Sequence, residues 1–119
     1  MIIHVKNKNT LIIDDFKFKC CVGKNGLNYD KNEGDFFTPK GIFNLKKLYF
    51  RKDRVGTPKC EIRKRIIKKD MAWCDDSSHQ KYNEEIKIYD RNLKEKLYRI
   101  DHKYDYIISI SHNEKKIPN

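Results

Sequence analysis

The chain of 119 residues has no apolar run near the ~20 residues that a membrane-spanning helix needs. Its start, Met1–Lys6, holds only a short apolar stretch interrupted by His4, so no secretory signal is predicted. As written, the chain is therefore expected to stay in the cytoplasm and to have no membrane segment. Internal repeats and low-complexity tails are also missing, and the length is that of a single domain.

Cysteine occurs at four positions, but in no spacing that predicts a metal site or a disulfide framework. A structural zinc site needs two pairs of closely spaced ligands. The nearest arrangement, Cys74 with His79, has no matching second pair. Because no export signal is present either, we expect reduced, structural cysteines. They are Cys20, Cys21, Cys60 and Cys74.

Positive charge is abundant: 27 Lys and Arg stand against 17 Asp and Glu, a formal net charge of +10. Such an excess can indicate a phosphate-rich partner. The lysines are spread along the chain, however, and the densest run, Arg63–Lys69, is interrupted by two isoleucines. A high content of Lys, Ile and Asn is also what an AT-rich genome gives at tolerant surface positions. We therefore interpret the charge as compositional bias, and nucleic acid is not the favoured partner.

Short alternating apolar segments predict a mainly β fold with long loops and at most short helices. A hairpin is expected around Asn7–Asn9, which separates two apolar segments. Longer loops and irregular segments are expected at Gly23–Thr38, Arg51–Cys60 and Met71–Tyr82. Leu93 and Leu97, four residues apart, indicate a short helix over Arg91–Arg99. The expected strands are Ile2–Val5, Leu11–Ile13, Phe16–Val22, Gly41–Phe50, Glu61–Ile67, Ile86–Ile88 and Tyr104–Ile110.

The last of these strands, Tyr104–Ile110, is the most apolar. Such a run is typical of the middle of a sheet, with a neighbour on each side. Only nine residues follow it in the sequence, so we expect it to be left at an edge, where it invites aggregation.

Several clusters of residues, taken in order, resemble the L,D-transpeptidase catalytic-domain family of the YkuD type, in its compact form without a signal peptide. The most specific is Gly34–Phe43, Gly-Asp-Phe-Phe-Thr-Pro-Lys-Gly-Ile-Phe, which matches the family signature Gly-Asp-x-x-Thr-Pro-x-Gly-x-Phe at every defined position. The other clusters are Cys21–Gly26, Ala72–Asp76 with Tyr82-Asn83, Glu95–Arg99 with Asp101-His102 and Tyr104-Asp105, and His112-Asn113.

The resemblance implies a β-sandwich or mixed sheet and a role in bacterial peptidoglycan cross-linking or remodelling in the cell envelope. In that family a cysteine thiolate attacks a stem peptide and forms an acyl-enzyme, with a His as base and backbone N–H groups for the oxyanion. No metal or organic cofactor is needed. The partners implied are peptidoglycan stem peptides, and the oligomeric state stays open.

The family's catalytic signature, a His followed by Ser or Thr, one residue and Gly-Cys, does not occur in these 119 residues. We therefore interpret residues 1–119 as the N-terminal portion of a single L,D-transpeptidase-like catalytic domain, incomplete at the C-terminus and inactive by itself. Cys74, with His79 and His102 further along, is the one substitute nucleophile worth weighing, although a reactive thiol needs a partly exposed, electropositive setting.

The remaining candidate residues shape a pocket or its loops. Asp35 and Thr38 flank a turn, where short polar side chains bond to backbone N–H groups. Adjacent Asp75 and Asp76 point apart in extended chain, so turn capping is expected of them. The full set is Asp35, Thr38, Gly41, Trp73, Asp75, Tyr82, Asn83, Arg99, His102 and Tyr104.

Two other functions stay open. Aromatic residues interleaved with lysines would suit a basic, non-catalytic module that binds nucleic acid or an anionic cell-wall polymer. The aromatic residues concerned are Tyr29, Phe36, Phe37, Tyr49 and Phe50. A remnant that recognises stem peptides without turnover is the second possibility.

Overall fold

The computed structural model describes residues 1–29, 34–88 and 94–113. The chain divides into two compact units, an N-terminal unit of Met1–Ile42 and a C-terminal unit that begins at Phe43. Both are built mainly from short strands, and the described residues contain a single helix of four residues. No helix among these residues has the length and apolar character needed to cross a membrane.

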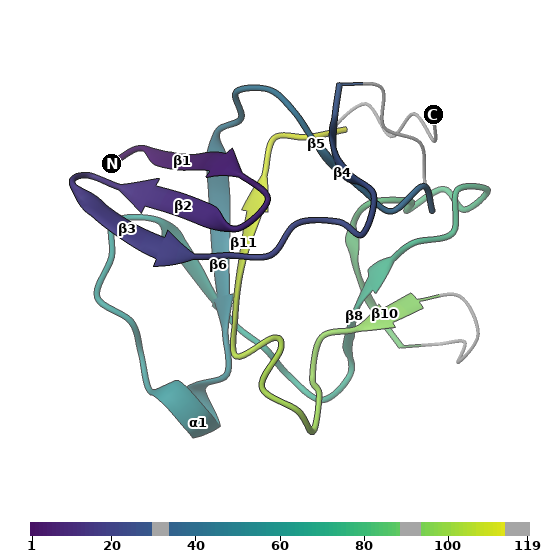
Figure 1. Ribbon diagram of the computed structural model, residues 1–119. Helices are drawn as coiled ribbons and strands as arrows, with labels where there is room; N and C mark the ends of the chain where they lie inside the picture. The colour runs from purple at the N-terminus through teal and green to yellow at the C-terminus, as the bar shows by residue number, and fades with distance from the viewer. Residues whose placement is uncertain (30–33, 89–93, 114–119) are drawn as a thin grey trace. The chain divides into compact units, whose positions relative to one another are not determined.

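The N-terminal unit starts with an antiparallel meander of β1 (Ile3–Asn7), β2 (Thr10–Ile13) and β3 (Phe16–Lys19) (Figure 1). Asn7 holds the first turn, because its side-chain oxygen accepts a hydrogen bond from the Asn9 N–H at 3.1 Å. The predicted hairpin around Asn7–Asn9 is therefore confirmed. The third predicted strand is shorter than expected, since β3 ends at Lys19.

The strand register places apolar side chains on one face of this meander and mostly polar ones on the other. Ile13 lies opposite both Ile3 and Phe16, and Leu11 lies opposite both Val5 and Phe18. These residues share a face because side chains alternate along a strand. Phe16 and Phe18 stay 70% and 50% exposed.

A short parallel pair completes the unit: β4 (Gly26–Asn28) lies beside β5 (Phe37–Pro39). The prediction of an irregular loop over Gly23–Thr38 is wrong at these residues, and Gly26 is buried. The segment has no periodicity to reveal the strands because each is only three residues long, and each depends on the other for its hydrogen bonds.

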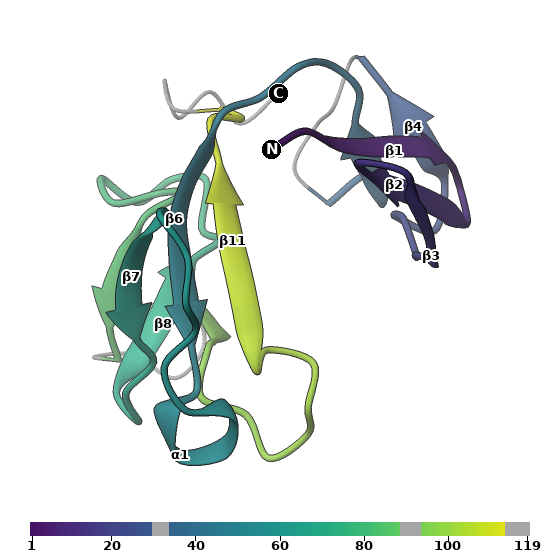
Figure 2. The ribbon, with the colours of Figure 1, turned by 90° about the vertical axis from the view of Figure 1, so that its left-hand side faces the viewer.

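The C-terminal unit contains a mixed sheet of order β11-β6-β7. In Figure 2 the long strands β6 (Leu45–Phe50) and β11 (Tyr106–Ile110) run side by side, with β7 (Arg63–Ile66) on the other flank of β6. β6 pairs antiparallel with β11 and parallel with β7. Among the described residues β11 pairs with β6 alone, so the most apolar strand does lie at an edge. Its side chains alternate between half-buried and exposed.

A second sheet, of order β10-β8-β9, is antiparallel. Its strands are β8 (Met71–Cys74), β9 (Glu85–Lys87) and β10 (Lys94–Lys96). The prediction that Met71–Tyr82 is irregular is wrong for β8, which has Met71, Ala72 and Cys74 buried. The short helix predicted over Arg91–Arg99 is also wrong for residues 94–99, because pairing with β8 extends the chain at 94–96 and irregular chain follows at 97–99. Residues 91–93 lie outside the described residues.

One hydrophobic core holds the C-terminal unit together. Tyr49, Ile67, Met71 and Leu97 form its buried centre, and Trp73, Tyr98, Tyr104 and Ile107 pack against it. The helix α1 (Lys52–Val55) follows β6 directly, in the segment Arg51–Cys60 that was predicted to be a loop, and that prediction is wrong for these four residues. A four-residue helix gives almost no periodic signal in sequence.

Candidate functional site

The Gly-Asp-x-x-Thr-Pro-x-Gly segment forms a tight turn in the N-terminal unit. The Asp35 carboxylate accepts a hydrogen bond from the Phe37 N–H at 2.9 Å. The Thr38 hydroxyl oxygen accepts a bond from the Gly23 N–H at 2.6 Å. Gly41 has φ 146°, a backbone conformation that favours glycine. Asp35 thus bonds a nearby N–H of its turn, as its residue type predicts, whereas Thr38 bonds the distant Gly23 and not its own turn.

The partner of this turn is the Cys21–Gly26 cluster. A Cβ on Gly23 would lie 2.4 Å from the Phe36 carbonyl oxygen, so only glycine allows this approach. Asn25 donates from its backbone N–H to the Phe36 carbonyl at 2.9 Å and from its side-chain amide to the Asp35 carbonyl at 2.8 Å. The first two clusters of the family resemblance thus form one hydrogen-bonded assembly.

In the C-terminal unit, Asn83 connects the cluster of Ala72–Asp76 and Tyr82-Asn83 with the cluster His112-Asn113. It accepts a hydrogen bond from the Trp73 indole N–H at 3.1 Å. Its amide group donates to the backbone carbonyls of Asn113 at 3.0 Å and His112 at 3.4 Å. Asn83 also has a positive φ of 61°, which asparagine tolerates better than most residues. The His112 ring packs edge-on against Phe43 with centroids 5.5 Å apart.

The β8–β9 connection buries Cys74 and leaves its acidic neighbour exposed. The Cys74 backbone bonds to Asn83 and Glu84 across the hairpin, and the residue is only 1% exposed. The His79 ring nitrogen accepts a bond from the Lys81 N–H instead. No hydrogen bond joins the Cys74 thiol to a His ring among the described residues.

Tyr82 and the acidic pair occupy different settings in the same hairpin. Tyr82 is buried, with 4% of its surface exposed. Asp75 is exposed, and Asp76 caps the turn by accepting bonds from the Ser78 N–H and hydroxyl at 3.0 and 2.7 Å. These bonds lower the pKa of the Asp76 carboxyl. Of the two aspartates, Asp76 is therefore the one with the predicted capping role.

Two arginines, one just before α1 and one within it, bond to the 99–105 loop. Arg51 is buried, forms a paired bond to Asp53 at 2.9 and 2.8 Å and donates to the Arg99 carbonyl at 2.7 Å. Its guanidinium also lies 3.6 Å from the centroid of the Tyr98 ring. The hydrogen bond from Arg51 lowers the pKa of Asp53 to about 2. This clamp is structural, because each of the three guanidinium nitrogens of Arg51 donates to Asp53 or to the Arg99 carbonyl.

Arg54 makes similar contacts with the cluster that contains Asp101-His102 and Tyr104-Asp105. It bonds the Ile100 and Asp101 carbonyls, each at 2.6 Å, and the Asp105 carboxylate at 2.9 Å. The His102 ring contacts the same carboxylate at 2.8 Å but is otherwise exposed. The bonds from Arg54 and then His102 lower the pKa of Asp105.

The remaining residues of this cluster form hydrogen bonds with one another. Arg99 bonds the Asp101 carboxylate at 2.9 and 2.6 Å. The Tyr104 hydroxyl is hydrogen-bonded to the Glu95 carboxylate. The predicted residues Arg99, His102 and Tyr104 thus lie on one loop. Trp73 and Asn83 lie elsewhere, hydrogen-bonded to each other.

A separate depression of about 310 Å³ lies in the C-terminal unit, and none of the predicted residues lines it. Arg65 and Lys68 do line it, and both belong to the densest basic run of the sequence. That run was the one signal that could have pointed here. No group of three or more His, Cys, Asp or Glu side chains is placed to hold a metal ion in the described part of the chain.

No protein family model, curated protein or solved structure matches this chain.

Proposed function

We propose that the chain is an L,D-transpeptidase-family protein of peptidoglycan cross-linking or remodelling, whose partner is the stem peptide of the cell envelope. The single observation that carries the proposal is the bond from the Gly23 N–H to the Thr38 hydroxyl at 2.6 Å. It joins two of the clusters that carry the family resemblance, at residues 21–26 and 34–43.

Three of the positions that match the family signature have a distinct geometric role. Asp35 caps the turn, the Thr38 hydroxyl accepts a bond from the Gly23 N–H and Gly41 supplies a positive φ. The turn role of Asp35 follows from its residue type, whereas the contact of Thr38 with Gly23 ties the signature segment to a second cluster of the resemblance. The agreement between motif and geometry therefore favours family membership.

Acyl transfer is not expected from residues 1–119 by themselves. The Ser/Thr-x-Gly-Cys signature is absent from the sequence, and the substitute thiol, Cys74, is 1% exposed. A nucleophile has to reach its substrate and be ionised by an electropositive setting. Cys74 fails the first requirement, so we propose that these residues bind peptidoglycan without turnover.

The alternative, a basic module that stacks nucleic-acid bases, is disfavoured by burial. Two of its five aromatic residues, Tyr49 and Phe50, are only 4% and 3% exposed and belong to the interior. Tyr29 and Phe36 are exposed at 75% and 64%, but Tyr29 already holds the Lys40 ammonium 5.2 Å from its ring centroid. A stacking platform needs several open ring faces in sequence along the strand.

The proposal is tested by co-sedimentation of the 119-residue chain with purified sacculi, at low salt and at 0.5 M salt, beside single-stranded DNA as a competitor polyanion. We expect sacculus binding to survive high salt, since specific recognition of stem peptides does not depend on charge alone. Binding to sacculi and DNA that disappears together as salt rises would contradict the proposal and support the basic module.

Acylation is tested separately by intact-mass measurement after incubation with a carbapenem, which resembles the family's acyl donor. We expect no mass increase. An adduct mapped to Cys74 would contradict the proposal that this chain binds without turnover.

A further inference from the structure

The strand β11 forms an open border of the mixed sheet in the C-terminal unit. Among the described residues its one strand neighbour is β6, and Figure 2 shows β6 between β11 and β7. Three large apolar side chains of β11, those of Tyr106, Ile108 and Ile110, are exposed on one face of the strand. The border therefore offers apolar side chains together with the backbone groups of an edge strand, to which another strand can add.

Hydrogen bonds at the two ends of β11 determine which of its backbone groups face the open side. The Asp105 carbonyl accepts a bond from the Arg51 N–H at 2.9 Å. The Ser111 N–H donates to the Asn44 carbonyl at 3.0 Å. Both bonds run towards β6 and its flanking residues, and the backbone groups of successive residues in a strand point to alternate sides. The residues whose N–H and C=O groups point away from β6 are therefore Tyr106, Ile108 and Ile110.

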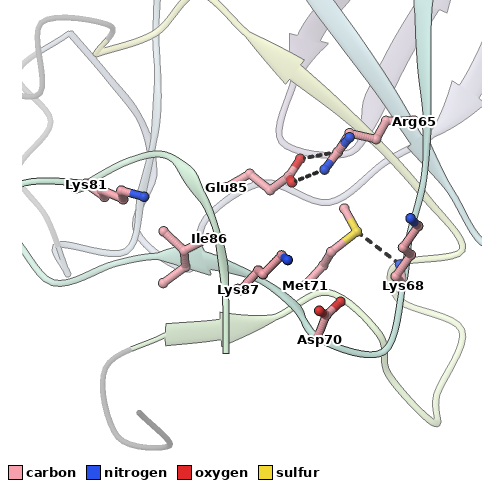
Figure 3. A pocket seen from close by; sticks show the side chains of 8 residues that line it. All are labelled: Arg65, Lys68, Asp70, Met71, Lys81, Glu85, Ile86 and Lys87. Carbon is pink, nitrogen blue, oxygen red and sulfur yellow. Dashed lines mark hydrogen bonds and ion pairs between the residues drawn. The ribbon is translucent and has the colours of Figure 1, made fainter. Parts of the chain in front are cut away.

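Basic side chains mark the other long borders of the sheets but not this one. In the described chain the edge strands of four or more residues are β1, β3, β7 and β11. Lysine or arginine occurs in β1, β3 and β7, and Arg65 of β7 makes two bonds of 2.7 Å to Glu85 (Figure 3). Charged side chains on an edge oppose the addition of a further strand. By contrast, Tyr106–Asn113 is the longest stretch of the sequence without Lys, Arg, Asp or Glu.

The sequence of β11 is complementary to itself in an antiparallel pair. When two copies are related by a two-fold axis at Ile108, Ile108 lies opposite its own equivalent, and Tyr106 lies opposite Ile110 of the second copy. These are the residues whose backbone groups point outwards, so each of these opposed pairs exchanges two backbone hydrogen bonds. On this face aromatic and β-branched side chains meet, which are favourable cross-strand neighbours. On the other face Ile107 lies opposite Ser109.

The same register brings no like charges together. Lys103 lies opposite Asn113 of the second copy, and Asp105 lies opposite Ser111. The Asp105 carboxylate is also bonded to Arg54 within its own chain, at 2.9 Å. Two chains that each carry a net charge of +10 repel one another. An uncharged border is therefore a surface through which two copies approach at low electrostatic cost.

We propose that β11 is a dimer interface, through which two copies of this chain pair edge to edge and antiparallel about a two-fold axis at Ile108. The occupant is a second copy because the apolar side chains and the outward backbone groups of β11 match their own equivalents in this register. The pairing closes on itself, since each copy uses its open border for the other. This inference does not depend on the proposed function.

The oligomeric state of the 119-residue chain tests the proposal, by analytical ultracentrifugation over a range of concentrations. We expect a reversible equilibrium between a species of 14.4 kDa and one of twice that mass. Higher salt should favour the dimer, because it screens the repulsion between two basic chains. A chain that stays monomeric at every concentration, a dimer that dissociates as salt rises, or assemblies that grow beyond two copies would each overturn the proposal.

The matched variants are Ile108→Lys and Ile66→Lys, which make the same substitution on opposite borders of one sheet. The two isoleucines are similarly exposed, at 38% and 40%. Ile108→Lys places two ammonium groups opposite each other on the axis, so it should weaken dimerisation at least about tenfold. Ile66→Lys should change the dissociation constant less than about twofold. Equal weakening by both variants, or an Ile108→Lys protein that still forms the dimer, would contradict the interface.

Amide hydrogen exchange shows which strand is paired and whether the variants are folded. The N–H groups of Tyr106, Ile108 and Ile110 should exchange slowly in the dimer and faster on dilution. The Ile107 N–H, which points towards β6, should stay protected at both concentrations and in the Ile108→Lys variant. A dimer in which dilution leaves exchange at Tyr106, Ile108 and Ile110 unchanged would be formed through another surface, and the proposal would be wrong.

Discussion

Tyr49 offers a quantitative check of the core, through the pH dependence of its hydroxyl. Burial, followed by the neighbouring Glu85 carboxylate, raises the pKa of Tyr49 from 10.0 to about 12. The residue is 4% exposed, so its tyrosinate form would lose hydration on folding. The unfolded chain ionises Tyr49 near pH 10, whereas the native state holds the proton until about pH 12.

The sign of the effect follows from proton binding. Between the two pKa values the native state binds more protons than the unfolded state, so stability falls as pH rises. The full contribution of this group is present below pH 10 and is lost towards pH 12. Two pKa units correspond to about 2.7 kcal/mol, of which about 1.4 kcal/mol is lost by pH 11.

The perturbation is Tyr49→Phe, which removes the titration together with the hydrogen bond to Glu85. At pH 8 we expect the variant to be less stable by about 1.5 kcal/mol, the usual value for a bond to a charged group. Near pH 11 the ionisation of Tyr49 lowers the free energy of unfolding of the original protein by a similar amount. The original protein and the variant should then be almost equally stable. Urea unfolding at pH 8, 10 and 11 measures the difference, in which effects of the other ionising groups cancel.

A stability difference that stays constant from pH 8 to pH 11 would refute this reasoning. It would mean that Tyr49 ionises at the same pH in both states, and therefore that its hydroxyl is not buried beside Glu85. Absorbance of tyrosinate at high pH gives an independent reading, because Tyr49→Phe should remove one group that titrates late.

Three further predictions concern close packing, the arginine clamp and thiol access. Gly23→Ala places a Cβ against the Phe36 carbonyl and should destabilise the N-terminal unit by about 1–3 kcal/mol; unchanged hydrogen exchange in β4 and β5 would contradict the close approach. Arg51→Met leaves the Arg99 carbonyl without its donor and should lower the free energy of unfolding in urea by about 2–3 kcal/mol. The control, Arg63→Met at an exposed position, should lower it by less than about 0.5 kcal/mol. Equal losses would show that the Arg51 contacts do not stabilise the protein. Cys74, the buried thiol of the four, should react with a thiol reagent only as the protein unfolds, so four fast-reacting thiols would contradict its burial.

Strands with a period-two pattern could be predicted from the sequence. The strands β3, β6, β7 and β11 fall within predicted segments, and β1, β2 and β9 overlap theirs, because alternation and turn residues are local properties. The edge position of β11 was also expected. Mixed pairing around β6 agrees with the mixed sheet that was predicted.

Strands defined by their neighbours could not be predicted. β8 has strands on both sides and is largely buried, yet polar residues around it suggested irregular chain. β10 carries leucines at helical spacing near it, but pairing with Ala72, Trp73 and Cys74 extends the chain. β4 and β5 are three residues each and exist only as a parallel pair. In each case tertiary pairing overrides local propensity.

The candidate site, too, could be predicted only in part from the sequence. The turn role of Asp35 followed from residue type, but its partner, the Phe37 N–H, did not, and neither did the bond from the Gly23 N–H to the Thr38 hydroxyl. The basic depression combines Lys68 with Lys81 and Lys87 from separate segments. The sequence shows the three lysines but not that they line one depression, since that depends on how the two sheets of the unit pack.

The central claim is that this chain recognises peptidoglycan stem peptides. Trp73 is the one tryptophan of the sequence, and its indole N–H is held by Asn83, so its NMR signal reports on the motif clusters of the C-terminal unit. The decisive measurement is a titration of that signal with a stem tetrapeptide ending in D-alanine, beside its all-L isomer. We predict a saturable shift with the stem peptide and a clearly weaker response to the all-L isomer. An unchanged indole signal, or equal responses to both peptides, would contradict the claim.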